Sequence, residues 1–434
     1  MLTHKAEIMA SISAKHDSHP LNSARLWSRV EDLSRITLPD QPWTRRAFSD
    51  LFFQGRAWLK AQFEAAGLTV HLDAAGNLVG RREGRNANAK PIITGSHCDT
   101  VMSGGRFDGI IGVLAGIEVA MALQEQGITL EHPFEVIDFL SEEPSDYGVS
   151  CVGSRGFAGL LDEGMLQERN PAGETLAAGI QRVGGNPLAL KAPLHAPDST
   201  AAFVELHIEQ GPVLETKQLP IGIVTNIVGI RRFKVVVDGQ PDHAGTTPMN
   251  IRRDALVGAA HVIQSVNSHA TNMLGGDHYV VATIGHLVLT PNASNAVPGR
   301  VEMMLEVRSD SAAVLETFVE EVVAAVRPGI EASGLGFSCT QVSHSLPTDC
   351  TPFMIDLIES AAGAQGYASM RMPSGAGHDA VYMAKTGPMG MIFIPCLKGR
   401  SHCPEEWIEP QQLMDGTRVL YETILQLDRV LAGQ

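Results

Sequence analysis

Four apolar segments of the chain have the character of buried strands, and helical stretches separate them. They are PIITGSH (91–97), PFEVIDFLSEE (133–143), AAFVELHIEQG (201–211) and PMGMIFIPC (388–396). Strands that alternate with helices are typical of an α/β fold whose sheet is mostly parallel. The pattern therefore predicts a mixed, mostly parallel sheet flanked by helices.

The segments around these strands are expected to extend the same domain. Residues 22–66 read as helix, and residues 68–84 alternate and turn as a hairpin does. Residues 112–127, which follow the first strand and its loop, are predicted to form a further helix.

The middle of the chain has a different pattern. Three segments alternate as half-exposed antiparallel strands do, at 231–240, 279–289 and 299–309. Two helices are expected between and after them, at 248–269 and 311–327. Together these elements predict a small α+β layer with its helices on one face of its sheet.

A chain of 434 residues is too long for one ordinary core, so two domains are expected. The α+β layer is interpreted as an insertion at 222–341. The first domain would comprise residues 1–221 and resume at 342–434.

Composition argues against several classes of function. The formal net charge of -15 and the lack of a basic run argue against nucleic-acid binding. The longest apolar run, at 110–122, is too short to span a bilayer and contains Glu118. No secretory signal is expected at the N-terminus, and six cysteines without a C-x-x-C pair favour a reducing cytoplasm.

The residues that could carry chemistry gather where the four strands end. A His or a carboxylate stands at or just beyond the end of each strand: His97, Asp108, Glu142, Glu143, His207, Glu209 and His402. In open α/β sheets, ligands bind at the carboxyl ends of the strands. We therefore predict a site at this edge of the sheet.

The residue types favour a metal site. Neutral His and carboxylates are ligands of Zn²⁺ and similar cations. Asp108 lies in a glycine-flanked turn before a helix, where its two oxygens could be shared between two cations. Glu142 and Glu143 are adjacent and point in different directions, so one could bind metal while the other acts as general base.

Each residue also has a purely structural interpretation. His97 could be a satisfied polar residue at a strand end, and the paired Glu could be a solvated turn. Asp108 could be the N-cap of the following helix, and His402, beside Cys403 and Pro404, could be only a turn residue. These interpretations do not explain why so many potential ligands share one edge.

Seven motifs resemble, in sequence order, the hydantoinase/carbamoylase family of metal-dependent amidases. That family includes N-carbamoyl-L-amino acid hydrolase, β-ureidopropionase and allantoate amidohydrolase, within the di-zinc aminopeptidase-like superfamily. The motifs span residues 95–407 and are GSHCDTVMSGGRFDG, SEEPSDYG, ELHIEQGPVLE, DHAGTTPMNIRRDAL, NAVPG, SGAGHDA and GRSHCPEEW. The resemblance implies a di-zinc aminopeptidase-like fold with an inserted lid and dimerisation domain.

The resemblance also implies a dinuclear centre with two divalent metal ions per subunit. His97 and His207 would bind one ion, Glu143 and His402 the other, and Asp108 would bridge the two. Zn²⁺ is the expected ion, with Mn²⁺, Co²⁺ or Ni²⁺ as alternatives.

Further residues acquire roles from the same resemblance. Glu142 would be the general base, and Asp99 would hydrogen-bond the ring of His97. His243 of the lid would stabilise the oxyanion, from the neighbouring subunit. The substrate would be bound by Gln210, Asn295, Arg308 and the glycine-rich backbone at Gly375. A surface salt bridge for Arg308, and turns for His243 and Asn295, are the structural alternatives.

The implied activity is hydrolysis of the linear C–N amide bond of an N-carbamoyl amino acid or related ureido acid. A metal-bridged water would attack the carbamoyl carbon and release amino acid, CO₂ and ammonia, in a homodimer formed through the lid. The alternatives are an aminoacylase or dipeptidase on the same scaffold, and an inactive dimeric binding protein. Asp146, Tyr147 and Cys403 depart from the pattern of many relatives, which leaves the substrate open.

Overall fold

The computed structural model describes residues 20–433, and the chain forms two compact units. Within the described residues, the first unit comprises 20–225, Cys350–Met372 and 378–433. The second comprises Asn226–Asp349 and Pro373–Gly377, so in sequence it interrupts the first.

A mixed sheet lies at the centre of the first unit, with strands in the order β1-β2-β4-β3-β5-β13-β6. The strands β4, β3, β5 and β13 pair in parallel, whereas β2 and β6 are antiparallel to β4 and β13. The α/β class with a mostly parallel sheet, predicted from the sequence, is therefore confirmed. The strands are β1 (Thr69–Leu72), β2 (Leu78–Arg82), β3 (Ile92–His97), β4 (Phe134–Phe139), β5 (Ala202–Ile208), β6 (Ile221–Ile227), β12 (Ser369–Ser374) and β13 (Met389–Ile394). The two-residue strand β11 (Thr348–Asp349) pairs with the last two residues of β6 and belongs to the second unit.

The four parallel strands form the interior of the first unit. Every residue of β3, β4, β5 and β13 is buried. Strands that are covered on both faces read as near-continuous apolar runs, which is why these segments were recognisable in the sequence. Because the four strands run in one direction, their carboxyl ends share one edge of the sheet.

Helix α4 (Ile110–Glu125) packs directly on this sheet. It is apolar on nearly all sides, and a helix of that composition must be buried. Two glycines one turn apart allow the close approach: a Cβ on Gly112 would lie 2.6 Å from the carbonyl oxygen of Leu206, and one on Gly116 would lie 2.7 Å from Val136. The start of α4 is thereby held beside the ends of β3 and β5.

The other helices of the first unit complete the cover of the sheet. Helix α13 packs on α4 and β13, and α12 packs on α5, β5 and β13. The helices are α2 (Ser23–Ser34), α3 (Asp50–Ala65), α5 (Val152–Phe157), α6 (Glu163–Gln167), α7 (Leu176–Arg182), α8 (Val213–Lys217), α11 (Pro352–Ala364), α12 (Ala380–Met383) and α13 (Pro410–Ala432).

The expectation of a helix over 22–66 is wrong in its middle. Helix α2 ends at Ser34, and α3 begins at Asp50 after Ser49, whose hydroxyl accepts a hydrogen bond from the Phe52 N–H. Pro39 and Pro42 lie between, and proline lacks the N–H that a continuous helix needs. In the intervening loop, residues 38–41 are exposed, whereas Thr44, Arg45 and Phe48 are buried.

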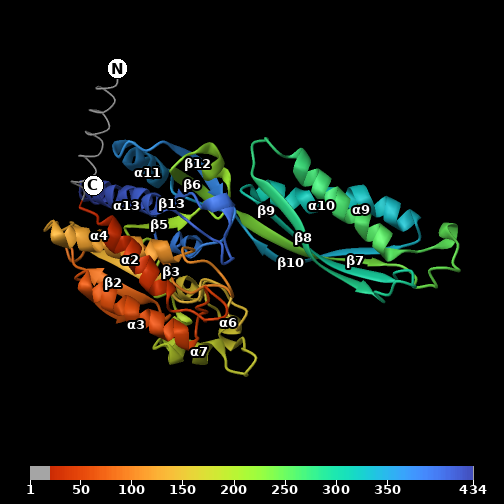
Figure 1. The fold of residues 1–434 in the computed structure, drawn as a ribbon, viewed down its shortest axis with the longest axis horizontal. Coiled ribbons are helices and arrows are strands. Elements are labelled where there is room, and N and C mark those ends of the chain that lie inside the picture. Colours follow the sequence, from red (N-terminus) through yellow and green to blue (C-terminus); the bar gives the residue numbers. More distant parts are fainter. Residues whose placement is uncertain (1–19, 434) are drawn as a thin grey trace, which may run out of the picture. The chain divides into compact units, whose positions relative to one another are not determined.

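The second unit contains an antiparallel sheet in the order β10-β7-β9-β8. Helices α9 (Ala255–Asn272) and α10 (Ala312–Ala332) pack together and against the sheet (Figure 1). The strands are β7 (Gly229–Asp238), β8 (Val280–Thr290), β9 (Arg300–Ser309) and β10 (Gly336–Ser345). Alternate residues of β9 are buried, as the sequence pattern of a half-exposed strand indicates.

Two details of this unit differ from the sequence-based expectation. Strand β10 was not expected, and it pairs with β7 as far as Ser345, so the predicted boundary at 341 falls inside a strand. The helix expected from 248 begins only at Ala255, where the side chain of Asp254 caps it. Among residues 20–433, no helix is both long and apolar enough to cross a membrane.

A buried asparagine ties the β1–β2 hairpin to the end of β4. Asn77 is 0% exposed, and its side-chain oxygen accepts the Leu140 N–H at 3.0 Å. Its side-chain nitrogen donates to Asp73 at 2.7 Å and to the Gly153 carbonyl at 3.1 Å. A buried polar group with this many partners is costly to remove, because its partners lose their hydrogen bonds without access to water.

We therefore expect Asn77→Ala to lower the free energy of unfolding by about 1–3 kcal/mol, measured by urea unfolding. Asn88→Ala is the matched control, since Asn88 is exposed. Equal unfolding midpoints for the two variants would contradict the role given to Asn77.

Candidate metal centre

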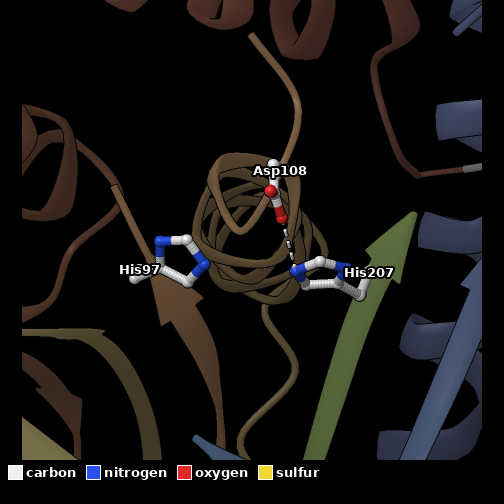
Figure 2. A group of neighbouring side chains, drawn as sticks. All are labelled: His97, Asp108 and His207. Carbon is white, nitrogen blue, oxygen red and sulfur yellow. Dashed lines mark ion pairs between the residues drawn. The ribbon is translucent and has the colours of Figure 1, made fainter. Parts of the chain in front are cut away.

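Three residues from different elements meet at the carboxyl edge of the parallel strands. His97 is the last residue of β3, His207 lies one residue before the end of β5, and Asp108 precedes Gly109, the N-cap of α4. Figure 2 shows the two rings and the carboxylate facing a common space. The parallel direction of β3 and β5 brings the rings together, and the position of α4 supplies the carboxylate.

Asp108 is shared between two groups of potential ligands. One oxygen, Oδ1, lies 3.1 Å from Nε2 of His207, and the other, Oδ2, lies 2.9 Å from Nε2 of His402. His402 is also 3.1 Å from Oε1 of Glu143. Within each group, His97–Asp108–His207 and Asp108–Glu143–His402, the ligand atoms lie within 4.8 Å of one another. This spacing is compatible with one cation in each group.

A third group, Glu205–His207–His378, competes for the same histidine. Nδ1 of His207 lies 2.9 Å from the carbonyl oxygen of Ile208, which leaves Nε2 as its nitrogen for a cation. Nε2 lies 3.1 Å from Oδ1 of Asp108 and also accepts the N–H of Gly109 at 3.1 Å, so a cation at Nε2 would replace that N–H while Nδ1 keeps its contact with Ile208. Burial lowers the pKa of His378 well below its usual value, so this ring is neutral.

The carboxylate of Asp99 holds the backbone of Glu142 and Glu143 and does not hydrogen-bond the ring of His97. Its carboxylate accepts the N–H groups of Glu142 at 3.3 Å and of Glu143 at 3.2 Å. Nδ1 of His97 is 3.0 Å from the Asp99 carbonyl oxygen but 3.8 Å from the carboxylate. Asp99 therefore contacts the ring of His97 through its main-chain carbonyl and not through its carboxylate, and this contact leaves Nε2 for a cation.

Glu142 faces the same space as the ligand groups. Its Oε2 lies 3.6 Å from Nε2 of His97, and its Oε1 accepts a weak hydrogen bond from the Cys151 thiol at 3.4 Å. Burial raises the pKa of Glu142 well above its usual value, with the carboxylate of Glu143 adding to the rise. A carboxylate with a raised pKa is a stronger base, which suits proton transfer.

The charges of the site depend strongly on one another. Burial alone would raise the pKa of Asp108, yet hydrogen bonds from His207 and His402 lower it well below its usual value. Hydrogen bonds to Asp108 and Glu143 raise the pKa of His402 to about 11. Without a cation, protons on histidine compensate the buried carboxylates, and a divalent cation would replace them.

The purely structural interpretations of Asp108 and Glu143 do not fit. The N-cap of α4 is Gly109, so Asp108 does not cap the helix. Glu143 is only 6% exposed, which is not expected of a solvated turn. His402 does lie in a left-handed turn, with φ of 55°, and that turn directs its ring to Asp108 and Glu143.

One of the residues singled out at the strand ends has another function. The carboxylate of Glu209 accepts the N–H groups of Val213 and Leu214, both at 2.7 Å, and so caps α8. The neighbouring Gln210 instead reaches the site, where its side-chain nitrogen donates to Oδ2 of Asp108 at 3.0 Å. Adjacent residues at this strand end therefore serve different purposes.

The remaining expected substrate-binding residues lie in the second unit. Arg308 donates to the carbonyl oxygen of Gly375 at 2.8 Å and pairs with Glu306 at 2.7 Å. The N–H of Ala244, next to His243, donates to the carbonyl oxygen of Asn295 at 2.9 Å. Within this unit, the structure thus brings Arg308 to Gly375 and the backbone at His243 to that at Asn295.

Two positions that depart from the pattern of relatives have structural partners. Asp146 forms an ion pair with Arg46 at 2.7 Å. Tyr147 is buried, packs edge-on against Phe48 and donates to Glu174.

Sequence reasoning missed two residues beside Asp108. The hydroxyl of Ser401 donates its proton to Glu406 at 2.7 Å, and its oxygen lies 3.2 Å from Oδ2 of Asp108. Glu406 in turn accepts the N–H of Asp108 at 3.1 Å. Both residues stand in the motif GRSHCPEEW, but no local pattern distinguishes the buried Glu406 from the exposed Glu405.

Comparison with known proteins decides the family. Residues 93–426 match the model of peptidase family M20/M25/M40. The chain belongs to this family. It is therefore a hydrolase of a metal-dependent family, in agreement with the ligand groups at the strand ends.

Similar proteins cover nearly the whole chain. The N-carbamoyl-L-amino-acid amidohydrolase of Paenarthrobacter aurescens is 37% identical and covers 93% of this chain and 98% of its own. The ureidoglycolate hydrolase of Arabidopsis thaliana is 33% identical, with 93% and 86% covered. The crystal structure of an amidase of the hydantoinase/carbamoylase family from Burkholderia multivorans has a TM-score of 0.84 at 37% identity, with 94% and 98% covered. The resemblance to the hydantoinase/carbamoylase amidases is confirmed.

Because His402 is protonated in the metal-free protein, a cation must displace that proton. We expect the apparent Zn²⁺ affinity to rise with pH between about 6 and 8, by up to about tenfold per unit for each proton displaced. Calorimetric titration in buffers of different ionisation enthalpy measures the released protons. His402→Ala should reduce the number of protons released on Zn²⁺ binding, whereas the control His278→Ala, at an exposed position, should not. An affinity independent of pH would contradict the proton displacement.

Proposed function

We propose that this protein hydrolyses the linear C–N amide bond of an N-carbamoyl amino acid or related ureido acid. The products are the free amino acid, CO₂ and ammonia. The family membership and the named relatives support this reaction class, since an N-carbamoyl-L-amino-acid amidohydrolase is similar over nearly its whole length.

The observation that carries the proposal is the position of Asp108 between two ligand groups. Its two oxygens face His207 and His402, and each group adds one more ligand, His97 or Glu143. Imidazole and carboxylate ligands suit Zn²⁺, Mn²⁺, Co²⁺ or Ni²⁺. We therefore assign two divalent cations to each subunit, with Zn²⁺ as the expected ion and Asp108 as the shared ligand.

When bound, such cations lower the pKa of water and polarise a carbonyl group. Glu142 takes the proton from the attacking water and delivers it to the leaving amine nitrogen as the C–N bond breaks. Its raised pKa and its place 3.6 Å from Nε2 of His97 support this role. Asp99 orients Glu142 and Glu143 by accepting their backbone N–H groups.

The second unit supplies the remaining parts of the proposal. It acts as a lid and as the surface of a cytoplasmic homodimer. Arg308 and Asn295 bind the substrate carboxylate, because the guanidinium fork matches two carboxylate oxygens. His243 stabilises the oxyanion, while Gln210 and the backbone at Gly375 contact the substrate.

An aminoacylase or dipeptidase remains the second candidate. It would use the same ligand groups and the same base, and would differ only in the residues around the scissile bond. Tyr147 and Asp146 do not favour either substrate class, because each already has a structural partner.

The test is an ammonia-release assay on metal-loaded protein. The panel holds N-carbamoyl-L- and -D-amino acids, N-carbamoyl-β-alanine and allantoate, with N-acetyl amino acids and dipeptides scored by free amine. We expect ammonia from at least one ureido substrate. We expect Glu142→Gln to lower kcat by at least about 10²-fold, the lower range for loss of a general base, with the metal content retained.

The matched control is Glu163→Gln, an exposed position in α6, which should keep the wild-type kcat. Free amine from the N-acetyl or dipeptide substrates, without ammonia from the ureido substrates, would overturn the substrate class. Wild-type activity in Glu142→Gln would overturn the assignment of the base.

A further inference from the structure

The loop that carries Asp108 and the loop that carries His402 are joined by one buried carboxylate. Glu406 is 1% exposed. Its Oε1 accepts the N–H groups of Phe107 at 2.8 Å and of Asp108 at 3.1 Å, across about 300 residues of sequence. Its Oε2 accepts the hydroxyl of Ser401, next to His402, at 2.7 Å. The single side chain therefore binds both loops.

The backbone at Gly105 passes very close to the carboxylate of Glu406. A Cβ on Gly105 would lie 1.8 Å from Oε1 of Glu406, so a glycine is needed for the loop to pass so close. The hydroxyl oxygen of Ser401 also lies 3.2 Å from Oδ2 of Asp108, which places Ser401 between Glu406 and the carboxylate that both ligand groups share. Two buried carboxylates this near repel each other, and the arrangement is tolerable only because each accepts several hydrogen bonds.

Aromatic rings also hold the same two loops. The guanidinium of Arg106 lies over the ring of Trp43 at 4.5 Å and over that of Trp407 at 4.7 Å. The buried ring of Phe107 lies 5.8 Å from that of Trp27 and 5.7 Å from that of Trp407. Such cation–π and aromatic contacts add stabilisation to the burial of the rings. The backbone at Asp108 is thus fixed by Glu406 and by the ring contacts of its two preceding residues.

We infer that Glu406 is a positioning residue, which sets the place of the Asp108 carboxylate between the two cations by accepting the N–H groups of its loop. This inference rests on the proposed dinuclear site. The positioning role depends on the hydrogen bonds that Glu406 accepts and not on its negative charge. Partners of metal ligands commonly act in this way, because they restrict the ligand to one orientation.

The test compares Co²⁺ binding by metal-depleted wild type, Glu406→Ala and Glu406→Gln, followed by the visible d–d absorption of the bound ion. The alanine variant loses all three contacts, and we expect its Co²⁺ affinity to fall by about 10- to 100-fold, with an altered d–d spectrum. The glutamine variant keeps an acceptor for the two N–H groups, and the Ser401 hydroxyl can accept from its amide. We expect it to retain the wild-type spectrum and nearly the wild-type affinity.

Glu405→Ala is the matched control, because Glu405 is the exposed neighbour and pairs only with Arg400 among the ion pairs of residues 20–433. It should bind Co²⁺ as wild type does. Tryptophan emission provides a second measurement, since three of the chain's four tryptophans, Trp27, Trp43 and Trp407, surround Arg106 and Phe107. Glu406→Ala should change this emission in the metal-free protein, and circular dichroism reports whether the variant is folded.

The outcomes separate this inference from the proposed function. Wild-type affinity and spectrum in a folded Glu406→Ala variant would overturn the positioning role while leaving the dinuclear site intact. A Glu406→Gln variant whose Co²⁺ affinity is as low as that of Glu406→Ala would also overturn the positioning role, because the negative charge of Glu406 would then be decisive. Absence of Co²⁺ binding by wild type would reject the metal centre itself, and lack of ammonia release with normal Co²⁺ binding would reject only the substrate class.

Discussion

The burial of many ionisable side chains at one edge of the parallel sheet is the constraint on which the first unit depends. His97, Asp99, Asp108, Glu143 and His207 are all less than a tenth exposed. Isolated charges at such places would be too costly to keep, so each must be hydrogen-bonded, paired or bound to a cation. The short contacts among them meet this requirement in part, and the two ligand groups offer places for cations to complete it.

Several residues around the site position these buried ionisable side chains. Gly112 and Gly116 bring α4 onto the sheet and so carry Asp108 to the strand ends. Asp99 uses its carboxylate on the backbone of the Glu pair, and Asn77 holds the strand end from which that pair extends. The backbone at Asp108 and at Glu143 is therefore held by a buried carboxylate of another segment, Glu406 and Asp99 respectively, which is how metal sites acquire a defined geometry.

The two units contribute different kinds of residue. The first contains every ligand proposed for the cations and the proposed base, on rigid strand ends and on loops with buried anchors. The second contains Asn295, Arg308 and Gly375, which are proposed to bind the substrate together with Gln210 of the first unit, and there Arg308 already has the partners Glu306 and Gly375. Placing most of the recognition residues apart from the metal ligands allows a metal-dependent scaffold to accept different substrates, since function depends on sites rather than on the fold.

The sequence by itself determined the fold class, the four parallel strands and the candidate ligands, because apolar runs and residue types are local properties. Only the tertiary structure decided which of two similar adjacent residues reaches the site and which has another role. Glu406 is buried on the Asp108 loop while Glu405 is exposed, Glu209 caps α8 while Gln210 reaches Asp108, and the Asp99 carboxylate binds the Glu pair rather than His97. These choices rest on hydrogen bonds between segments up to 299 positions apart, which no local pattern encodes.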